Sequence, residues 1–316
     1  MTKSGLVRIA VVLLGIVVLL VGRGCYFYSG YYSPPATAAP DYGDIIVPPA
    51  PAAEFPEEVV PAKEMAVLID LARYNDFDLE ELNALMLQLI SRGLTITLLD
   101  MEDELETELS SDVGALIIVS PTHEFSKEEK EALHDFLDNG GRLLLIADPT
   151  RRDSINKLSL EFGLIFEPGY LYNMTEYETN YRNIFVTDFE DSEITRGLKQ
   201  VVFYTAGSIS SADGGIAFVD DNTHSSQIES RTRLSPMAMA NDSKVLAIYD
   251  LTFMTEPYNG TLDNNQLIAN IADWLADAVV ELDDTDEEDD PETETDNNVY
   301  NEIGNQDERE VNRGEP

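Results

Sequence analysis

Residues 112–149 read as a buried strand, a helix and a second buried strand, and this stretch limits the possible folds more than any other. Residues 113–119 and 143–147 are continuous apolar runs, typical of strands covered on both faces. Between them, Ser126 and Glu129 have the spacing of a capping box, and a glycine pair follows the apolar helix stripe. Such a strand–helix–strand pattern is a βαβ unit, so we predict a parallel sheet covered by helices.

Strands and helices continue to alternate on both sides of this unit. Apolar or alternating runs predict further strands at residues 65–70, 94–99, 164–166, 183–186, 201–205, 216–219 and 245–249. The other predicted features are helices that begin at Asp78, Asp153 and Asp263, a loop at residues 170–182 and a single helical turn at residues 191–198. No change of composition divides residues 63–280, so we expect one α/β domain with a mainly parallel sheet and helices on both faces.

The N-terminus has the pattern of a membrane anchor. Lys3 and Arg8 precede Ile9–Val21, an uncharged run of 13 residues, and several aromatic residues follow soon after. The run is shorter than the roughly 20 residues of an ideal spanning helix. The positive charges favour an N-terminus in the cytoplasm and a domain outside. We therefore predict a single-pass, uncleaved signal anchor at residues 1–24 that enters the cell membrane through residues 6–22.

Two other interpretations of the N-terminus stay open. In a lipoprotein the signal is cleaved before Cys25, which then carries a lipid, but Arg23 stands where such a motif has small or apolar residues. A conventional cleaved signal lacks a clear A-x-A site. The anchor interpretation is therefore preferred over both.

Two segments have compositions that do not suit a packed core. Residues 25–62 include eight of the chain's 15 prolines and are predicted to be a semi-extended Pro/Ala-rich linker. Residues 281–316 hold 16 Asp or Glu and two Arg, which predicts a disordered acidic tail. The formal net charge of the whole chain is −40. Such a surface repels nucleic-acid phosphates, so nucleic acid is excluded as a partner.

Residue types that bind metals and cofactors are scarce. Cys25 is the only cysteine, and His123, His134 and His224 show no ligand spacing such as H-E-x-x-H. Neither G-x-G-x-x-G nor G-x-x-x-x-G-K-[ST] occurs. We therefore expect neither a metal nor a cofactor.

Polar residues gather where the predicted strands end. Open α/β sheets bind ligands outside the carboxyl ends of their strands. The ligand-binding candidates at these ends are Asp70, Arg73, Asn75, Thr122, Arg151 and Asp250. Two arginines among acidic residues favour an anionic or polar ligand. The plainer interpretation, preferred for each residue taken alone, is that the aspartates cap turns and helices.

A catalytic interpretation uses three residues of the same strand ends. Ser120 is the candidate nucleophile, His123 the base and Asp148 the residue that orients it. Ser120 lacks a G-x-S-x-G elbow, and Pro121 removes an N–H that could have stabilised an oxyanion. The sequence therefore gives this interpretation little support.

Three sequons are candidate glycosylation sites. They begin at Asn173, Asn241 and Asn259, each in a predicted loop.

Eight segments occur along the chain in an order found in a known family. They are Asp70–Asn75, Ile90–Gly93, Leu116–Pro121, Asn139–Arg142, Ile194–Leu198, Asp250–Phe253, Asp263–Asn265 and Asn270–Leu275. Together they resemble the uncharacterised class I glutamine-amidotransferase-like domains of bacteria and archaea. Relatives in that superfamily include the extracytoplasmic GldG-like auxiliary components of ABC-type transport systems. The resemblance covers residues 63–278 and implies a flavodoxin-like sheet.

The resemblance does not extend to amidotransferase activity. Members with that activity have a nucleophilic cysteine at a tight turn after a central strand, followed later by a His–Glu pair. Here the corresponding strand is predicted to end in Ala147–Asp148–Pro149, and Cys25 lies beside the membrane segment. Cysteine-dependent glutaminase chemistry through a thioester is therefore excluded.

These observations favour a membrane-anchored extracytoplasmic domain that binds a partner or ligand without catalysis. The resemblance implies an ABC-type permease or ATPase, or another envelope protein, as the partner. One alternative is a divergent hydrolase that uses Ser120, His123 and Asp148 at the strand ends. Another is a structural surface protein without a specific partner.

Overall fold

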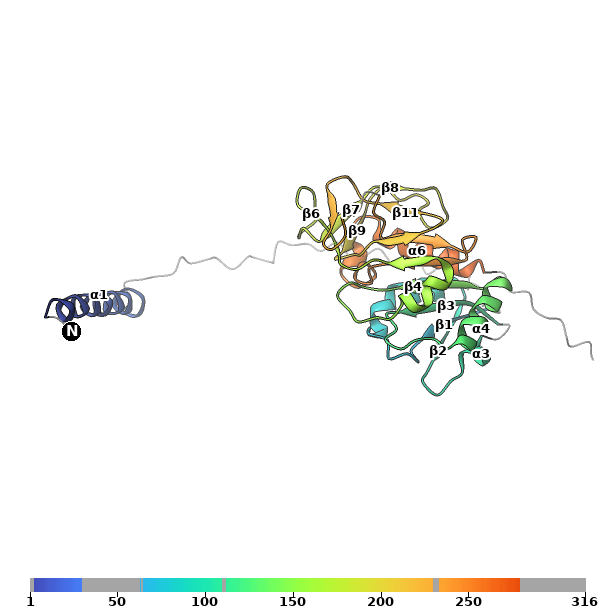
Figure 1. Cartoon of the computed structure of the whole chain (residues 1–316), viewed down its shortest axis with the longest axis horizontal. Helices are drawn as coiled ribbons and strands as arrows, with labels where there is room; N and C mark the ends of the chain where they lie inside the picture. The colour runs from blue at the N-terminus through green and yellow to red at the C-terminus, as the bar shows by residue number, and fades with distance from the viewer. Residues whose placement is uncertain (1–2, 30–62, 64, 110–111, 230–232, 279–316) are drawn as a thin grey trace, which may run out of the picture. The chain divides into compact units, whose positions relative to one another are not determined.

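The computed structural model describes residues 3–29, 63, 65–109, 112–229 and 233–278 (Figure 1). The chain divides into two compact units, residues 1–58 and 59–316, and each is described by itself. Most of the predicted linker and the whole predicted acidic tail lie outside the described residues.

The first unit contains one long helix, α1 (Lys3–Tyr28). Its 26 residues correspond to about 39 Å at 1.5 Å per residue, longer than a hydrocarbon core of about 30 Å. It is long and apolar enough to cross a membrane, as an anchor or as a signal sequence would be. The predicted apolar segment is confirmed. The helix also includes Arg23 and the aromatic residues after it, so it continues past residue 24.

The second unit, residues 59–316, is called the domain below. Its main sheet has eight strands in the order β2-β1-β3-β4-β14-β13-β11-β8. Their bounds, in that order, are Thr95–Leu99, Ala66–Asp70, Val113–Val119, Arg142–Ile146, Val245–Ile248, Met237–Ala240, Gly215–Phe218 and Asp188–Phe189. The first five strands pair in parallel, and the last three extend the sheet antiparallel. The expected mainly parallel α/β sheet is confirmed.

Helices cover both faces of this sheet. They are α2 (Asn83–Ser91), α3 (Leu105–Glu108), α4 (Lys127–Asp138), α5 (Asn156–Ser159) and α6 (Asn264–Ala276). Side chains of α2 and α6 form one core with Val67 of β1, and those of α3, α4 and α5 form a second core with Leu68. Successive residues of a strand point to opposite faces. Strands buried on both faces therefore read as continuous apolar runs.

The second half of the domain contains three small sheets of two strands each. They pair β5 (Leu164–Phe166) with β10 (Ile209–Ser211), β6 (Leu171–Asn173) with β12 (Thr223–Ser225), and β7 (Asn183–Val186) with β9 (Val201–Tyr204). In Figure 1, β6, β7 and β9 lie together at the end of the domain away from β2. Two expectations were wrong: residues 164–166 leave the main sheet, and the predicted loop contains a strand.

Two helix predictions need correction, and the third helix, α6, begins after Asp263 as expected. The helix expected from Asp153 consists of α5 and a 3₁₀ turn, Leu160–Phe162, and ends at Gly163 with φ 69°. Residues 191–198 form turns without a helix. Asp263 precedes α6 but makes no side-chain bond to it, because its carboxylate accepts the Gln200 and Lys199 N–H groups instead. Among the described residues, the other 3₁₀ turns are Leu79–Leu82, Thr252–Met254 and Tyr258–Gly260.

Candidate functional site

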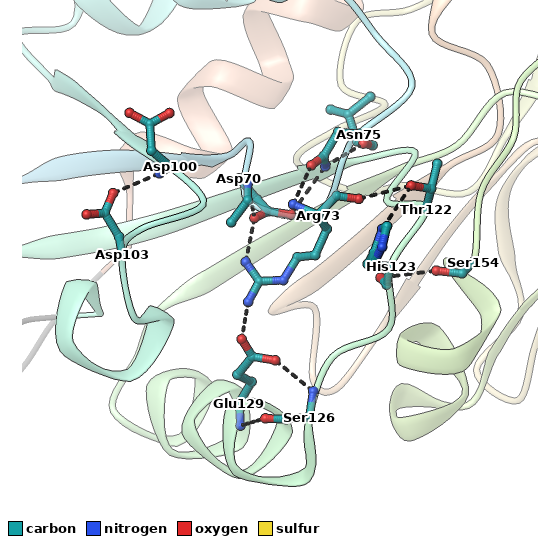
Figure 2. A network of polar contacts seen from close by, with 12 residues as sticks. Asp70, Arg73, Asn75, Asp100, Asp103, Thr122, His123, Ser126, Glu129 and Ser154 are labelled. Atoms are coloured by element: carbon teal, nitrogen blue, oxygen red, sulfur yellow. Dashed lines mark hydrogen bonds and ion pairs between the residues drawn. The ribbon is translucent and has the colours of Figure 1, made fainter.

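Polar side chains meet between the carboxyl ends of β1 and β3, where the strand order reverses. Open α/β sheets bind ligands at such switch points. Asp70, the last residue of β1, is 1% exposed, and Arg73 Nη1 donates a 2.7 Å hydrogen bond to its Oδ1. Nη2 of Arg73 forms an ion pair with Glu129 of α4, and the guanidinium carbon lies 4.4 Å from the centre of the Phe125 ring. Figure 2 shows the guanidinium between the two carboxylates.

The same network joins the loop after β1 to the loop after β3. Asn75 Nδ2 donates to the carbonyl of the last residue of β3 at 2.8 Å and to Asp70 Oδ2 at 3.2 Å. Thr122 Oγ1 donates to the Arg73 carbonyl at 3.2 Å. The structure thus brings four of the predicted ligand-binding residues together, Asp70, Arg73, Asn75 and Thr122 (Figure 2).

Burial and the ion pair act on Asp70 in opposite directions. Burial raises the pKa of the Asp70 carboxyl above its ordinary value, because the charged form loses hydration. The positive charge of Arg73 and hydrogen bonds from Asn75 and Arg73 lower the pKa in part. The carboxylate therefore depends on Arg73 as its charge partner.

A second buried network lies at the ends of β4 and β14. Asp148 Oδ1 accepts bonds from the N–H and the hydroxyl of Thr150, at 2.8 and 2.6 Å. Asp250 Oδ2 accepts the Tyr204 N–H at 2.6 Å, and its Oδ1 accepts the Thr252 N–H at 2.8 Å. Both carboxylates are fully buried. Burial, and then the charge of Asp148, raise the pKa of Asp250 well above its ordinary value, against the backbone donors.

Arg151 has a carboxylate partner of its own. Its Nη1 lies 2.9 Å from Glu81 Oε2 and 2.8 Å from the Asp76 carbonyl, and its Nη2 lies 2.5 Å from Glu81 Oε1. Since Arg73 is also paired, both candidate arginines are already neutralised by the domain's own acids. The geometry therefore weakens the expectation of an anionic ligand.

The candidate catalytic residues do not form a relay. Ser120 has φ 39°, and its buried Oγ has no hydrogen-bond partner among the described residues. His123 is exposed, with Nδ1 3.3 Å from Thr122 Oγ1 and its ring 4.6 Å from the Tyr74 ring centre. Asp148 contacts neither Ser120 nor His123 through a hydrogen bond among the described residues.

Replacing Ser120 by alanine is expected to leave the free energy of unfolding unchanged or raise it by up to about 1 kcal/mol. A buried hydroxyl without a partner costs free energy, and alanine removes it. Urea unfolding of residues 59–316 measures the change. Thr122→Ala is the comparison, because Thr122 makes hydrogen bonds that alanine loses and is expected to destabilise. A loss above about 1 kcal/mol in Ser120→Ala contradicts the interpretation.

Asp250 is expected to make the domain less stable as the pH rises. Its folded-state pKa is raised, so its contribution is fully present below its ordinary pKa of 3.8 and is lost as the pH rises through the raised value. Asp263 has the opposite sign: the Gln200 and Lys199 N–H donors lower its pKa, so its contribution is present above 3.8 and lost on acidification.

The two aspartates therefore form a matched pair for a pH experiment. Asp250→Asn is expected to lessen the fall in unfolding free energy between about pH 4 and pH 8, and Asp263→Asn to shift the pH dependence the other way. Urea unfolding across this range measures the effect of Asp250, and its extension below pH 3.8 measures that of Asp263. Equal pH dependence in the wild type and Asp250→Asn argues against a raised pKa at Asp250.

The three sequons differ in accessibility. Asn173 lies in β6 instead of a loop, and its buried amide donates to Asp220 Oδ1 at 3.0 Å and Thr223 Oγ1 at 3.1 Å. Asn241 is exposed in the β13–β14 turn, and Asn259 is half-buried in a 3₁₀ turn. Modification of the folded domain therefore favours Asn241 over Asn173.

Sequence reasoning missed a hollow of about 510 Å³ at the amino edge of the sheet, lined in part by Arg142, Lys244 and Trp274. Lys244 Nζ donates to the Leu137 carbonyl at 2.7 Å, and Arg142 donates to the Trp274 carbonyl. Each cation thus satisfies a carbonyl near the C-terminal end of a helix, where positive charge is favoured. The basic residues at the starts of β4 and β14 were the sequence feature that could have indicated this hollow.

A second hollow, of about 590 Å³, is lined in part by the acidic residues Asp78, Glu80, Glu81 and Glu256. In the described part of the chain, no group of three or more His, Cys, Asp or Glu side chains has the arrangement of a metal site.

Comparisons with known proteins give similarities of structure only. No family model matches the chain, and no curated protein matches it. The N-terminal domain of mmIFT52 is similar at 18% identity and a TM-score of 0.55, over 68% of this chain and 100% of that domain. A ThuA-like protein from Bacteroides uniformis is 11% identical with a TM-score of 0.43, over 70% of this chain and 95% of its own. The first likeness supports the α/β fold, and neither carries a function to this chain.

Proposed function

We propose that this chain is a membrane-anchored extracytoplasmic binding module without catalysis, and that it serves an ABC-type transport system as an accessory component. The long apolar helix α1 supports the anchor. The accessory role is supported by the sequence resemblance alone.

The domain also has the strand order of a flavodoxin-like fold. Its five parallel strands, β1, β2, β3, β4 and β14, lie in the spatial order 2-1-3-4-5. Flavodoxin-like sheets have this order and bind ligands between their first and third strands. In this chain the fifth parallel strand follows the fourth only after the small sheets of the second half.

The observation that carries the binding proposal is the state of the carboxyl edge. The polar side chains there bond to one another and to the backbone, so they fix the loops, and both candidate arginines are already paired with carboxylates. The side chains that these fixed loops present to solvent include Tyr74, 62% exposed, and His123, whose ring lies tilted against it at 4.6 Å. A rigid, exposed aromatic pair suits recognition, because little freedom is lost on binding.

Cross-linking in native membranes tests this proposal. The full chain is cross-linked, extracted in detergent and captured, and bound proteins are identified by mass spectrometry. We expect an ABC permease or ATPase to be enriched with the wild type and depleted with the Tyr74→Ala/His123→Ala double variant. Leu160→Ala, at an exposed site on a 3₁₀ turn, is the control. No transporter component above a control bait contradicts the accessory role.

One observation favours the hydrolase as a second candidate. Ser120 follows β3 in a left-handed conformation, and nucleophilic serines of α/β hydrolases also sit in strained turns after a strand. Its buried hydroxyl argues against this role. Ester hydrolysis by the domain that is lost in Ser120→Ala and in His123→Ala would establish the hydrolase, and activity at background in all three proteins would exclude it for the esters used.

A further inference from the structure

An aromatic cluster lies on the strand pair β6–β12 and uses side chains other than those of the networks described above. Leu171 and Asn173 of β6 are buried, so the alternation of the strand turns Tyr172 outward. His224 of β12 is its direct cross-strand partner, with ring centres 5.9 Å apart. The two rings form a cross-strand pair, the unit that stabilises such short ladders.

Two more tyrosines and an arginine extend this pair. The rings of Tyr170 and Tyr181 each lie 6.4 Å from that of Tyr172. The Arg182 guanidinium lies 4.4 Å from the Tyr170 ring centre and 5.4 Å from that of Tyr181. Tyr170, Tyr172, Tyr181, Arg182 and His224 are called the tyrosine platform below. All five are half-buried or exposed, so solvent reaches the platform.

Backbone hydrogen bonds fix the platform before any partner binds. The Tyr170 N–H donates to Ser226 Oγ at 2.9 Å, and the Ser226 N–H returns a 2.8 Å bond to the Tyr170 carbonyl. The Asn173 N–H donates to the Tyr181 carbonyl at 2.8 Å. At Gly169, φ is 90°, and a Cβ would lie 2.6 Å from Ser226 Oγ, so this tight approach requires glycine. Preorganised tyrosines bind with a small loss of conformational freedom.

Charge decides what the platform fits. Residues 63–280 carry 39 Asp or Glu and 15 Lys or Arg, and Glu176, Glu178 and Asp220 lie in the segments that carry the platform. Aromatic faces attract cations, and the negative surroundings add to this attraction. The Arg182 guanidinium, close to two of the rings, is an example of this contact within the domain itself.

We propose that the tyrosine platform docks an arginine- or lysine-bearing segment of a partner protein. This inference goes beyond the accessory role, because it uses other side chains and holds whether or not the partner is a transporter. Tyrosine and arginine are the residue types that most often dominate protein–protein binding energy.

A peptide titration tests the proposal on the full chain in detergent. The probe is a fluorescent octapeptide of alternating arginine and glycine, compared with a glutamine–glycine peptide of equal length. Titrations are run at low salt and at about 1 M salt, where screening over about 3 Å removes attraction by distant acids. We expect the arginine peptide alone to bind, and Tyr172→Ala and Tyr181→Ala to weaken it about tenfold. Leu87→Ala, at a side chain that is 67% exposed on α2, is the control and should bind as the wild type does.

Two outcomes overturn the inference. One is equal affinity in the wild type, Tyr172→Ala and Tyr181→Ala. The other is binding of the arginine peptide that disappears entirely at high salt, which would mark attraction by the acidic surface as a whole. Thermal unfolding accompanies each titration, and Tyr172→Phe, which keeps the ring, replaces Tyr172→Ala if that variant fails to fold. Tyr172→Phe should retain binding of the arginine peptide, and Tyr181→Ala is then the variant that should weaken it.

Discussion

Replacing Arg73 by methionine is expected to lower the free energy of unfolding of the domain by about 3 to 5 kcal/mol at neutral pH. The variant keeps an apolar stem against Phe125 but removes the cation from Asp70, whose side chain is 1% exposed. A buried carboxylate then keeps only the Ala72 N–H and the Asn75 amide as donors. Urea unfolding of residues 59–316 measures the loss. The loss should shrink at low pH, because protonation removes the unpaired charge.

Two controls separate the buried pair from ordinary ion pairing. The Asp70→Asn/Arg73→Met double variant removes both charges, so it should recover much of the stability that Arg73→Met loses. Lys127→Ala breaks the exposed pair Lys127–Glu131, whose side chains are 78% and 62% exposed, and should change stability far less than Arg73→Met does. A loss in Arg73→Met no larger than that in Lys127→Ala would show that the network does not fix the carboxyl edge.

The second large effect is expected at Trp274 in α6. Trp274→Ala should cost about 3 to 5 kcal/mol, because the ring is among the largest buried side chains and the variant leaves a cavity. The Trp274 Nε1–H also donates to the Ser243 carbonyl at 3.1 Å, and the Arg142 guanidinium lies 5.4 Å from the ring. Urea unfolding again measures the change.

Trp274→Phe is the graded comparison. It keeps an aromatic ring but leaves the Ser243 carbonyl without that donor, so its loss should be clearly smaller than that of alanine. Leu87→Ala, at a side chain that is 67% exposed on α2, should stay within about 0.5 kcal/mol of the wild type. Similar losses in Trp274→Ala and Leu87→Ala would contradict the assigned core.

The central sheet was predictable because its signals are local. The runs at β3 and β4 are apolar throughout since both faces are covered, and the capping box at Ser126 marked the start of α4. The small sheets were harder to predict because their strands are short and their partners distant. β6 has three residues and pairs with β12 about fifty residues later, so tertiary packing decides its conformation. β13 was missed because its Met-Ala sequence lacks β-branched residues.

The candidate site was predictable in position but not in its bonding. The predicted strand ends identified Asp70 and Arg73, which contact each other and lie only three positions apart in the sequence. The partners Glu129 for Arg73 and Glu81 for Arg151 lie 56 and 70 residues away, so no local pattern reveals them. Glu129 was recognised only in the capping box, yet its other oxygen also neutralises Arg73. Candidate ligand-binding arginines therefore turned out to be paired internally.

The topology of the chain in its native membrane is the most direct test of the central claim, an anchored domain outside the cytoplasm. Cys25 is the only cysteine, so Cys25→Ser gives a thiol-free background. Ser4→Cys and Glu176→Cys are added separately, one at the start of α1 and one in an exposed loop of the domain. Intact cells are treated with a membrane-impermeant maleimide before and after permeabilisation.

The proposed topology has a clear signature in this experiment. The Glu176→Cys chain should be labelled in intact cells, the Ser4→Cys chain only after permeabilisation, and both chains should stay in the membrane fraction at full length. The reverse labelling, or recovery of a soluble chain that lacks its N-terminal residues, would contradict the anchored arrangement.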